Sequence, residues 1–293
     1  MESIEKPKLI NRKYRRLSKL GDGSIGDVYL AENIQNGRKV TIKIQKKLQD
    51  ASMEESNQQF QNEIAFLSLQ QHPFIIGFIE SFQWIDAQHN FSPLCIVYEL
   101  AEPQTLFDYI INAEMSISEE QALTWFAQIC MALDYMHEGL HRNLKPGNIL
   151  LVREEKGLVA KIADFGIIKD DEDGEENTAF IGARRFFPPE RVTQQPYNQK
   201  ADVWATGILL YFMITKCYPF PDIERKDYVK KLADCDLLCR KTISEPVQQL
   251  IESLLQKNHE NRPGLKEVLQ IPLVKNQTEI IKPIGQNTAR DNP

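Results

Sequence analysis

Several polar side chains that can take part in chemistry lie close together in residues 141–148, His-Arg-Asn-Leu-Lys-Pro-Gly-Asn. The central one, Asn143, carries an amide, which offers one carbonyl acceptor and two N–H donors. A carboxylate accepts at both oxygens and can take up a proton near neutral pH, whereas an amide has no useful basicity. A site built around Asn143 therefore has no general base at that position.

A glycine-rich loop, residues 21–26, lies between two stretches that predict strands, residues 14–20 and 28–33. The pattern Gly-x-Gly-x-x-Gly is weak by itself and also fits an ordinary hairpin turn. A dinucleotide-binding loop runs from a strand into a helix, whereas this loop runs into another strand. We therefore expect a loop whose glycines let backbone amides approach phosphate groups without Cβ clashes.

The next strand expected along the chain, residues 40–44, alternates apolar and polar side chains and carries Lys43. A lysine on a strand is by itself more often a solvated charge than a functional one. Residues 54–69 then predict a helix with Phe60, Ile64 and Leu67 on its inner face, and Glu63 is one position from that stripe. Glu63 is the expected partner of Lys43.

In this order, these segments resemble the catalytic loop, the glycine-rich loop and the Val-Ala-Ile-Lys strand of eukaryotic protein kinases of the Ser/Thr type. Residues 164–166 (Asp-Phe-Gly), 182–190, 202–207 and 261–263 resemble later motifs of the same family, so the resemblance covers about residues 14 to 275. The activation-segment spacing and residues 218–220 (Tyr-Pro-Phe) favour the NIMA-related or calmodulin-dependent groups. Asn143 stands where the family has the Asp that accepts the proton of the substrate hydroxyl.

The resemblance implies that the chain binds ATP and Mg²⁺. Lys43, held by Glu63, would contact the α- and β-phosphates, while Asn148 and Asp164 would be the Mg²⁺ ligands, because their oxygens suit a hard cation. Tyr98 would be the gatekeeper beside the adenine pocket. The remaining nucleotide contacts implied are Gly21, Gly23 and Gly26 over the phosphates, the backbone of Glu99 and Ala101 at the adenine edge, and Val28, Thr41 and Leu150 around the ring. Thr41 replaces the usual Ala, which predicts a tighter and less apolar pocket.

The segment of residues 170–178 has the position and the acidic composition of a kinase activation loop. Thr178 is a candidate phosphorylation site, because Arg142 could pair with its phosphate. Two departures from the family follow: Ala183 replaces the Thr that would bridge the catalytic Asp and Lys145, and Phe186 lacks the usual Tyr hydroxyl. The family pattern also implies that Arg262 pairs with Glu190 and that Asp202 holds the backbone around His141 and Arg142.

Composition limits the alternatives. The chain has 293 residues, of which 42% are hydrophobic, and a net charge of -6, which argues against a dominant nucleic-acid or anionic-membrane role. No apolar run approaches the roughly 20 residues that span a bilayer, so an intracellular, cytoplasmic protein is expected. The five cysteines are scattered, which predicts reduced structural thiols; Cys235 and Cys239 lack further ligands for a metal.

The predicted class is α+β, a two-lobed kinase fold with a small, mainly antiparallel β lobe carrying one regulatory helix and a larger α-helical lobe. The expected divisions are an N-terminal segment (1–13), a kinase domain (14–275, with the small lobe at about 14–98, the hinge at 99–102 and the large lobe at about 103–275) and a polar tail (276–293) with terminal disorder. Ser118 is expected to cap a helix, with Gln121 completing a capping box.

Two functions fit these expectations. In one, the chain is a nucleotide-binding pseudokinase that acts by conformation on an unknown partner. In the other, it is a Ser/Thr kinase that retains slow transfer, or one inactivated by an engineered Asp to Asn change. Ala183 favours the first, because a single engineered substitution would leave the interacting Thr in place.

Overall fold

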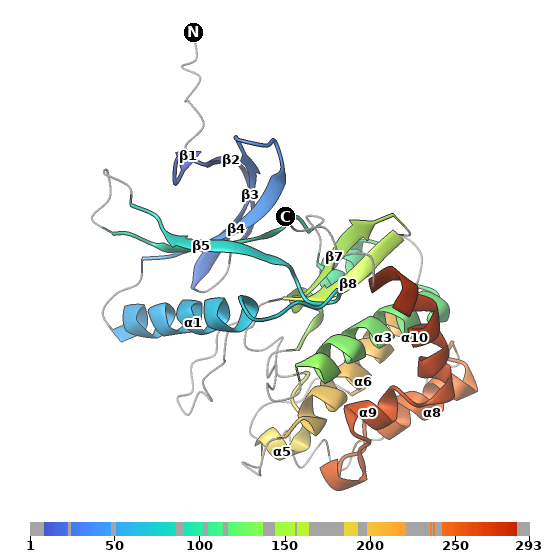
Figure 1. The fold of residues 1–293 in the computed structure, drawn as a ribbon. Helices are drawn as coiled ribbons and strands as arrows, with labels where there is room; N and C mark the ends of the chain where they lie inside the picture. Colours follow the sequence, from blue (N-terminus) through green and yellow to red (C-terminus); the bar gives the residue numbers. More distant parts are fainter. Residues whose placement is uncertain are drawn as a thin grey trace. The chain divides into compact units, whose positions relative to one another are not determined.

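A computed structural model describes residues 9–22, 25–47, 51–85, 91–101, 105–113, 117–136, 144–155, 157–163, 185–192, 198–220 and 242–285, and in addition Leu232, Cys235 and Leu237. The described residues fall into two units (Figure 1). The first holds the described residues of 9–71 and 75–101, and the second holds those of 72–74, 105–163 and 185–285. No helix in these ranges is long and apolar enough to cross a membrane.

The first unit is built on a six-stranded antiparallel sheet with the strand order β1-β2-β3-β4-β6-β5. The strands are β1 (Leu9–Ile10), β2 (Tyr14–Asp22), β3 (Gly26–Asn33), β4 (Lys39–Gln45), β5 (Phe78–Gln83) and β6 (Leu94–Glu99). The expected strands are therefore present, and the two that flank the glycine-rich loop extend further into it than residues 14–20 and 28–33 predicted.

The two faces of β4 have different neighbours, because successive strand side chains point to opposite sides. Val40, Ile42 and Ile44 belong to an apolar cluster with Ile10, Tyr14, Ala31, Cys95 and Val97. Thr41 and Lys43 pair in register with Tyr98 and Ile96 of β6 and belong to the opposite face. Cys95 in the apolar cluster is a free thiol, and burial raises its pKa to about 12.

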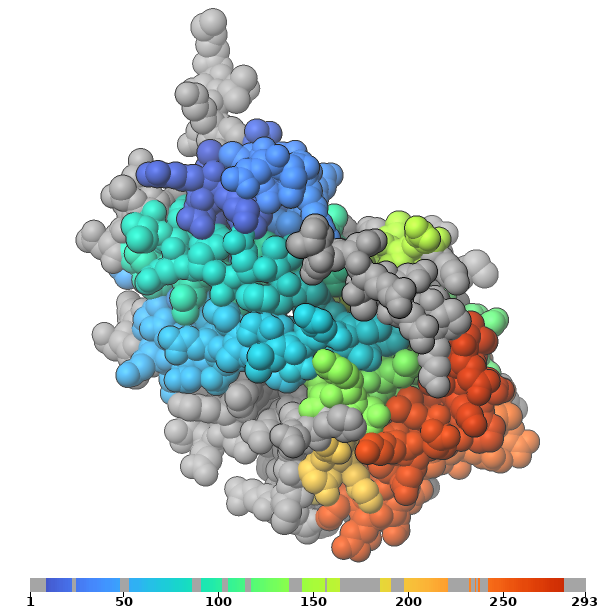
Figure 2. All heavy atoms as spheres, in the orientation of Figure 1, coloured from blue at the N-terminus to red at the C-terminus, as the bar shows by residue number. Residues whose placement is uncertain are grey.

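One helix, α1 (Ala51–Leu67), accompanies this sheet. It starts three residues before the expected start at residue 54 and ends two residues before the expected end at residue 69. Four of its side chains are almost fully buried and recur at helical spacing: Ser56, Phe60, Glu63 and Leu67. The opposite side of α1, which includes Glu54, Glu55 and Gln58, is exposed, and the helix forms part of the surface seen in Figure 2.

The second unit combines a hairpin, β7 (Ile149–Glu154) and β8 (Gly157–Ile162), with helices (Figure 1). The longer ones are α2 (Leu106–Asn112), α3 (Glu119–Tyr135), α6 (Lys200–Thr215), α8 (Glu245–Leu254) and α10 (Pro272–Gly285), and the short ones are η1 (Pro146–Asn148), α5 (Pro189–Val192), η3 (His259–Asn261) and α9 (Leu265–Val268). Every residue of α6 from Ala201 to Ile214 is buried, so α6 is the centre of this unit. The α+β class predicted from the sequence is confirmed.

Helix α3 begins where the sequence placed its start. Ser118 is the N-cap, and its side chain accepts a hydrogen bond from the Gln121 backbone N–H at 3.2 Å. The inner side of α3 joins the hairpin, because Trp125 Nε1 donates to the Leu158 carbonyl (3.0 Å) and Gln128 Oε1 accepts from the Ala160 N–H (2.8 Å).

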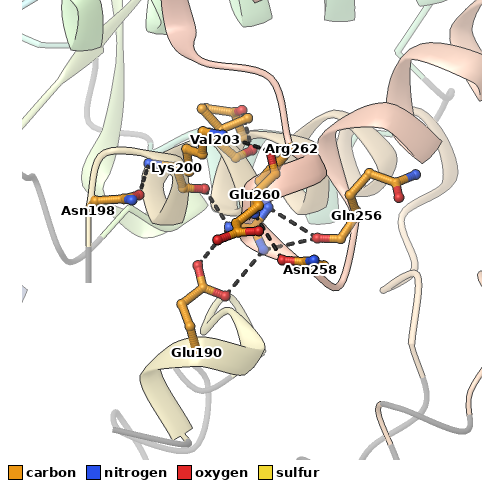
Figure 3. A network of polar contacts seen from close by, with 9 residues as sticks. Glu190, Asn198, Lys200, Val203, Gln256, Asn258, Glu260 and Arg262 are labelled. Carbon is orange, nitrogen blue, oxygen red and sulfur yellow. Dashed lines mark hydrogen bonds and ion pairs between the residues drawn. The ribbon is translucent and has the colours of Figure 1, made fainter. Parts of the chain in front are cut away.

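Arg262 fixes several segments of the second unit in place (Figure 3). Its guanidinium donates to both carboxylate oxygens of Glu190 (2.7 and 3.2 Å), to the Lys200 carbonyl (2.6 Å) and twice to the Gln256 carbonyl (3.0 and 3.2 Å). All five N–H donors of the Arg262 side chain are therefore hydrogen-bonded, and the residue is only 1% exposed. The pairing of Arg262 with Glu190 that the family pattern implied is present.

The expectation of a disordered tail from Asn276 onward is wrong for residues 276–285, which continue α10. Val274, Thr278 and Ile281 recur at helical spacing and are buried at 0%, 6% and 1% exposure. Gln277 also accepts a hydrogen bond from Thr124 of α3 at 2.9 Å. The polar residues between these positions hide the helical period, which is why composition alone predicted disorder.

His72 belongs to the second unit although it lies between elements of the first. Its ring stacks on Tyr135 at 4.8 Å, and its Nδ1 accepts a hydrogen bond from the Phe74 N–H at 3.3 Å. Burial lowers the pKa of His72 to about 4. The neutral imidazole is therefore the form that the fold accepts.

We predict that this histidine makes the protein sensitive to mild acid. Unfolded His72 takes up a proton below a pKa of about 6.5, whereas the folded side chain resists until about pH 4, so the free energy of unfolding falls as the pH drops between these values. Chemical denaturation of wild type and His72→Gln at pH 7 and pH 5 measures the effect. His72→Gln should lose less stability on acidification than wild type, while His259→Gln, the matched control, should lose as much. Equal losses in all three proteins would contradict the assignment.

Candidate nucleotide-binding site

Lys43 and Glu63 form a buried ion pair in the first unit. Lys43 comes from β4 and Glu63 from α1, and Lys43 Nζ lies 2.8 Å from Glu63 Oε2. Their side chains are 11% and 1% exposed. Lys43 Nζ also lies 5.5 Å from the centroid of the Phe60 ring, one helical turn before Glu63. The partner that the sequence predicted for Lys43 is the one that the structure gives it.

The second oxygen of Glu63 also has a partner, which the sequence did not predict. The Tyr98 hydroxyl of β6 donates to Glu63 Oε1 at 2.6 Å. Thr41, two residues before Lys43, pairs with Tyr98 in the β4–β6 register, so Lys43 and Tyr98 reach Glu63 from adjacent strands. A buried carboxylate needs donors to both oxygens, because an unsatisfied buried acceptor costs about 1–3 kcal/mol. Tyr98 and Lys43 together meet that need.

The glycine-rich loop is described at Gly21 and Gly26. A Cβ atom on Gly26 would lie 2.9 Å from Phe60 Cζ and 3.0 Å from the Ile44 carbonyl oxygen, so no larger residue fits without a shift of the backbone or of the Phe60 ring. Among the described residues, a Cβ atom on Gly21 would meet only Val28 Cβ, at an ordinary 3.9 Å. The close approach of α1 and β4 therefore requires glycine at position 26.

Four charged residues tie the strands on either side of the loop to the end of β4. Lys19 Nζ lies 2.9 Å from Asp22 Oδ2 and 3.1 Å from Asp27 Oδ1, and Lys46 pairs with both carboxylates, at 3.3 Å for Asp27. Hydrogen bonds from Lys46 and then from Lys19 hold the pKa of Asp22 below its usual range. The sequence showed these charges but not their pairing, which depends on the β2–β3–β4 register.

The expected adenine-side residues of the first unit lie on β3 (Val28), on β4 (Thr41) and at or just past the end of β6 (Glu99 and Ala101). The backbone N–H of Glu99 donates to the Gly77 carbonyl (2.8 Å), and its side chain accepts from the Gly77 N–H (2.8 Å). A ligand contact through the Glu99 backbone would therefore have to use the carbonyl group. Ala101 is 4% exposed, and Thr41 is 7% exposed with a hydroxyl that finds no hydrogen-bond partner in the described part of the chain. That hydroxyl adds no stabilising contact there.

The second unit carries three more of the expected residues. Asn148 is 6% exposed at the end of η1; its N–H donates to the Lys145 carbonyl and its carbonyl accepts from the Ala163 N–H, both at 2.9 Å. Leu150 follows on β7 and forms a β-bridge with Thr105. The short helix thus places Lys145 and Asn148 directly before the hairpin.

Five of the expected residues lie outside the described ranges, so the structure places none of them: Gly23, Arg142, Asn143, Asp164 and Thr178. Ala183, His141 and Phe165 lie outside them as well.

Comparison with known proteins identifies the class of protein. Residues 14–274 match the protein kinase domain family, so the chain belongs to the protein kinase family. The sheet-based unit with α1 and the helical unit are the small and large lobes of the two-lobed kinase fold.

The three relatives compared are kinases by name, and two of them are named Ser/Thr kinases. The chain is 34% identical over 287 residues to the putative sperm motility kinase W of Mus musculus, covering 97% of this chain and 54% of that protein. It is 32% identical over 273 residues to the putative serine/threonine-protein kinase A of Trypanosoma brucei brucei (89% and 61%). It is 33% identical over 275 residues to the serine/threonine-protein kinase nekl-2 of Caenorhabditis elegans (89% and 74%). The chain therefore has a eukaryotic Ser/Thr protein kinase domain, and it spans only 54–61% of the first two of these relatives.

We predict that Tyr98→Phe destabilises the first unit. The substitution removes only the hydroxyl and leaves Glu63 Oε1 buried without this donor, which should lower the free energy of unfolding by about 1–3 kcal/mol. Urea denaturation measures the change. Tyr29→Phe on β3 is the matched control and should change stability by less than about 0.5 kcal/mol. Equal stability of wild type and Tyr98→Phe would show that the hydrogen bond contributes nothing.

Proposed function

We propose that the chain is an ATP- and Mg²⁺-binding member of the Ser/Thr protein kinase family whose phosphate transfer is impaired and which acts by conformation on a protein partner. The observation that carries the proposal is a contrast. The Lys43–Glu63 pair is assembled, while Asn143 occupies the position of the catalytic base.

The described residues suit ATP. An ammonium group without a partner would swing into solvent. Glu63 holds Lys43 at 2.8 Å, and the corresponding lysine of protein kinases contacts the α- and β-phosphates. Gly26 allows the backbone of β3 to lie close to Phe60. Asn148 offers an amide oxygen, and Asp164, which lies outside the described residues, would add a carboxylate; both are hard donors that Mg²⁺ prefers. When bound, Mg²⁺ would neutralise the charge of the phosphates.

The residues of the catalytic loop argue for slow transfer. A carboxylate at position 143 would accept the proton of the substrate hydroxyl, and an amide cannot. Lys145 would still supply a positive charge beside the transferred group. Ala183 removes the hydroxyl that would link position 143 to Lys145, so the hydrogen-bond network of the loop lacks two members.

A second candidate function is a Ser/Thr kinase that transfers the ATP γ-phosphate slowly, or whose Asp at position 143 was replaced by engineering. The relatives favour it, because they are named as kinases, and so does the intact Lys43–Glu63 pair. Under either function we place the kinase domain at residues 14–275 and the protein in the cytoplasm. Arg142 would bind a phosphate on Thr178 if that residue is modified.

Binding of ATP is the first test. With a dissociation constant of tens of micromolar, millimolar Mg·ATP should stabilise the fold by about 2–3 kcal/mol through mass action. Thermal denaturation with and without Mg·ATP measures the shift. Lys43→Met should abolish the shift, and Lys39→Met, an exposed lysine of the same strand, should preserve it. An unchanged midpoint in the wild type, together with no displacement of a fluorescent nucleotide analogue, would refute nucleotide binding.

Transfer of phosphate is the second test. A positioned base contributes about 10²–10⁴ in rate, and kinases turn over at about 1–100 per second, so wild-type turnover should lie at or far below about 1 per second. Asn143→Asp alone should recover little, and the double change with Ala183→Thr should gain more than the two single changes combined, because the two residues share one network. Phosphate incorporation into a generic Ser/Thr protein measures the turnover of the wild type, both single variants and the double variant. Wild-type turnover at ordinary kinase rates that depends on Lys43 would overturn the pseudokinase function.

A further inference from the structure

Gln45 is a buried polar residue that the nucleotide site does not use. It ends β4 two residues after Lys43, so both side chains lie on the same side of the strand, which is the side away from the apolar cluster. Gln45 is 4% exposed. An amide at that depth is tolerated only when its donors and acceptor are paired.

The Gln45 amide joins three elements of the first unit. Its Nε2 donates to Asn57 Oδ1 (2.7 Å) and to Ser56 Oγ (3.1 Å) of α1, and its Oε1 accepts from the Leu94 N–H (3.1 Å) at the start of β6. A backbone N–H is a donor only, so the carbonyl oxygen of Gln45 must face Leu94 and the NH₂ group must face α1. The orientation of the amide is fixed by its partners.

Among the described contacts, polar groups therefore hold the buried side of α1 to the sheet at two places. Ser56 and Glu63 are seven residues apart, which separates the two places by two helical turns, or about 10 Å along the axis. Phe60, which is 0% exposed, fills the space between them. Attachment at Glu63 alone would let the rest of the helix pivot. The contacts of Gln45 remove that freedom, and none of them involves a ligand.

We propose that Gln45 is a positioning residue: it fixes α1 against the sheet and so keeps Glu63 beside Lys43. The backbone of Gln45 pairs with Gly26 in the β3–β4 register, but the side-chain amide bonds only to Ser56, Asn57 and Leu94, none of which is an expected nucleotide contact. The effect of the amide on ligands therefore passes through α1.

Hydrogen–deuterium exchange of the full chain without nucleotide tests the placement of α1. Gln45→Met keeps the length of the side chain and removes the three hydrogen bonds, so the amides of residues 54–67 should exchange about tenfold faster or more, while those of β2 and β3 keep their rates. Gln58→Met is the matched control, a change from the same residue to the same residue on the exposed side of α1, and it should leave these rates unchanged. Should Gln45→Met fail to fold, Asn57→Ala breaks the contact from the helix side, with an expected increase of about threefold.

Unchanged exchange in α1, or an equal increase in α1, β2 and β3, overturns the proposal, since the second result is a general loss of stability.

Ligand binding provides a second measurement, which a purely structural role of Gln45 would leave unchanged. This measurement rests on the proposed ATP binding. Because Glu63 acts through Lys43 on the phosphates, Gln45→Met should weaken ATP binding about fivefold to tenfold and leave adenosine binding unchanged. Equal weakening of both ligands contradicts a role through Glu63. If the wild type binds no ATP, the proposed function fails, and the exchange rates alone decide the role of Gln45.

Discussion

The first unit depends on one buried negative charge. A carboxylate that is 1% exposed is stable only if its oxygens are bonded, and Glu63 is bonded by an ammonium on one side and a phenol on the other. That requirement sets the position of α1 relative to β4 and β6, since a shift of the helix by even one hydrogen-bond length would leave a charge unpaired in an apolar setting. The apolar residues Phe60 and Leu67 add area to the contact but cannot by themselves define its register.

The strand β4 contributes both to the apolar core of the sheet and to the polar contacts with α1, because its two faces differ in chemistry. One face is aliphatic and supplies the core of the sheet, while the other presents Lys43 and Gln45 to the helix. The β4–β6 pairing brings Tyr98 to the same helix from the neighbouring strand. A slip of one residue in that pairing would move Tyr98 to the apolar face and Glu63 would lose a donor. The apolar core and the polar face therefore enforce the same register.

Local sequence patterns were sufficient to predict the helices and strands. They predicted far fewer of the contacts between these elements. The strands around the glycine-rich loop, the helix after β4 and the Ser118 cap follow from periodicity and local signals, and the Arg262–Glu190 pair follows from the family resemblance. The Tyr98–Glu63 hydrogen bond could not be read from the chain, because it depends on the register between β4 and β6 and on the rotation of α1. The helical residues 276–285 were missed because the buried positions of α10 are few and lie among polar ones. A search for the spacing of Val274, Thr278 and Ile281 would have found them.

Gly26 bears on how glycine-rich loops are interpreted. Its lack of a side chain is required by the Phe60 ring and the Ile44 carbonyl, two groups of the fold itself. A chain released from phosphate transfer would still be constrained to glycine at this position. The last glycine of such a motif is thus evidence about packing between a strand and a helix. It carries no information on turnover, and an assignment of activity should give it correspondingly little weight.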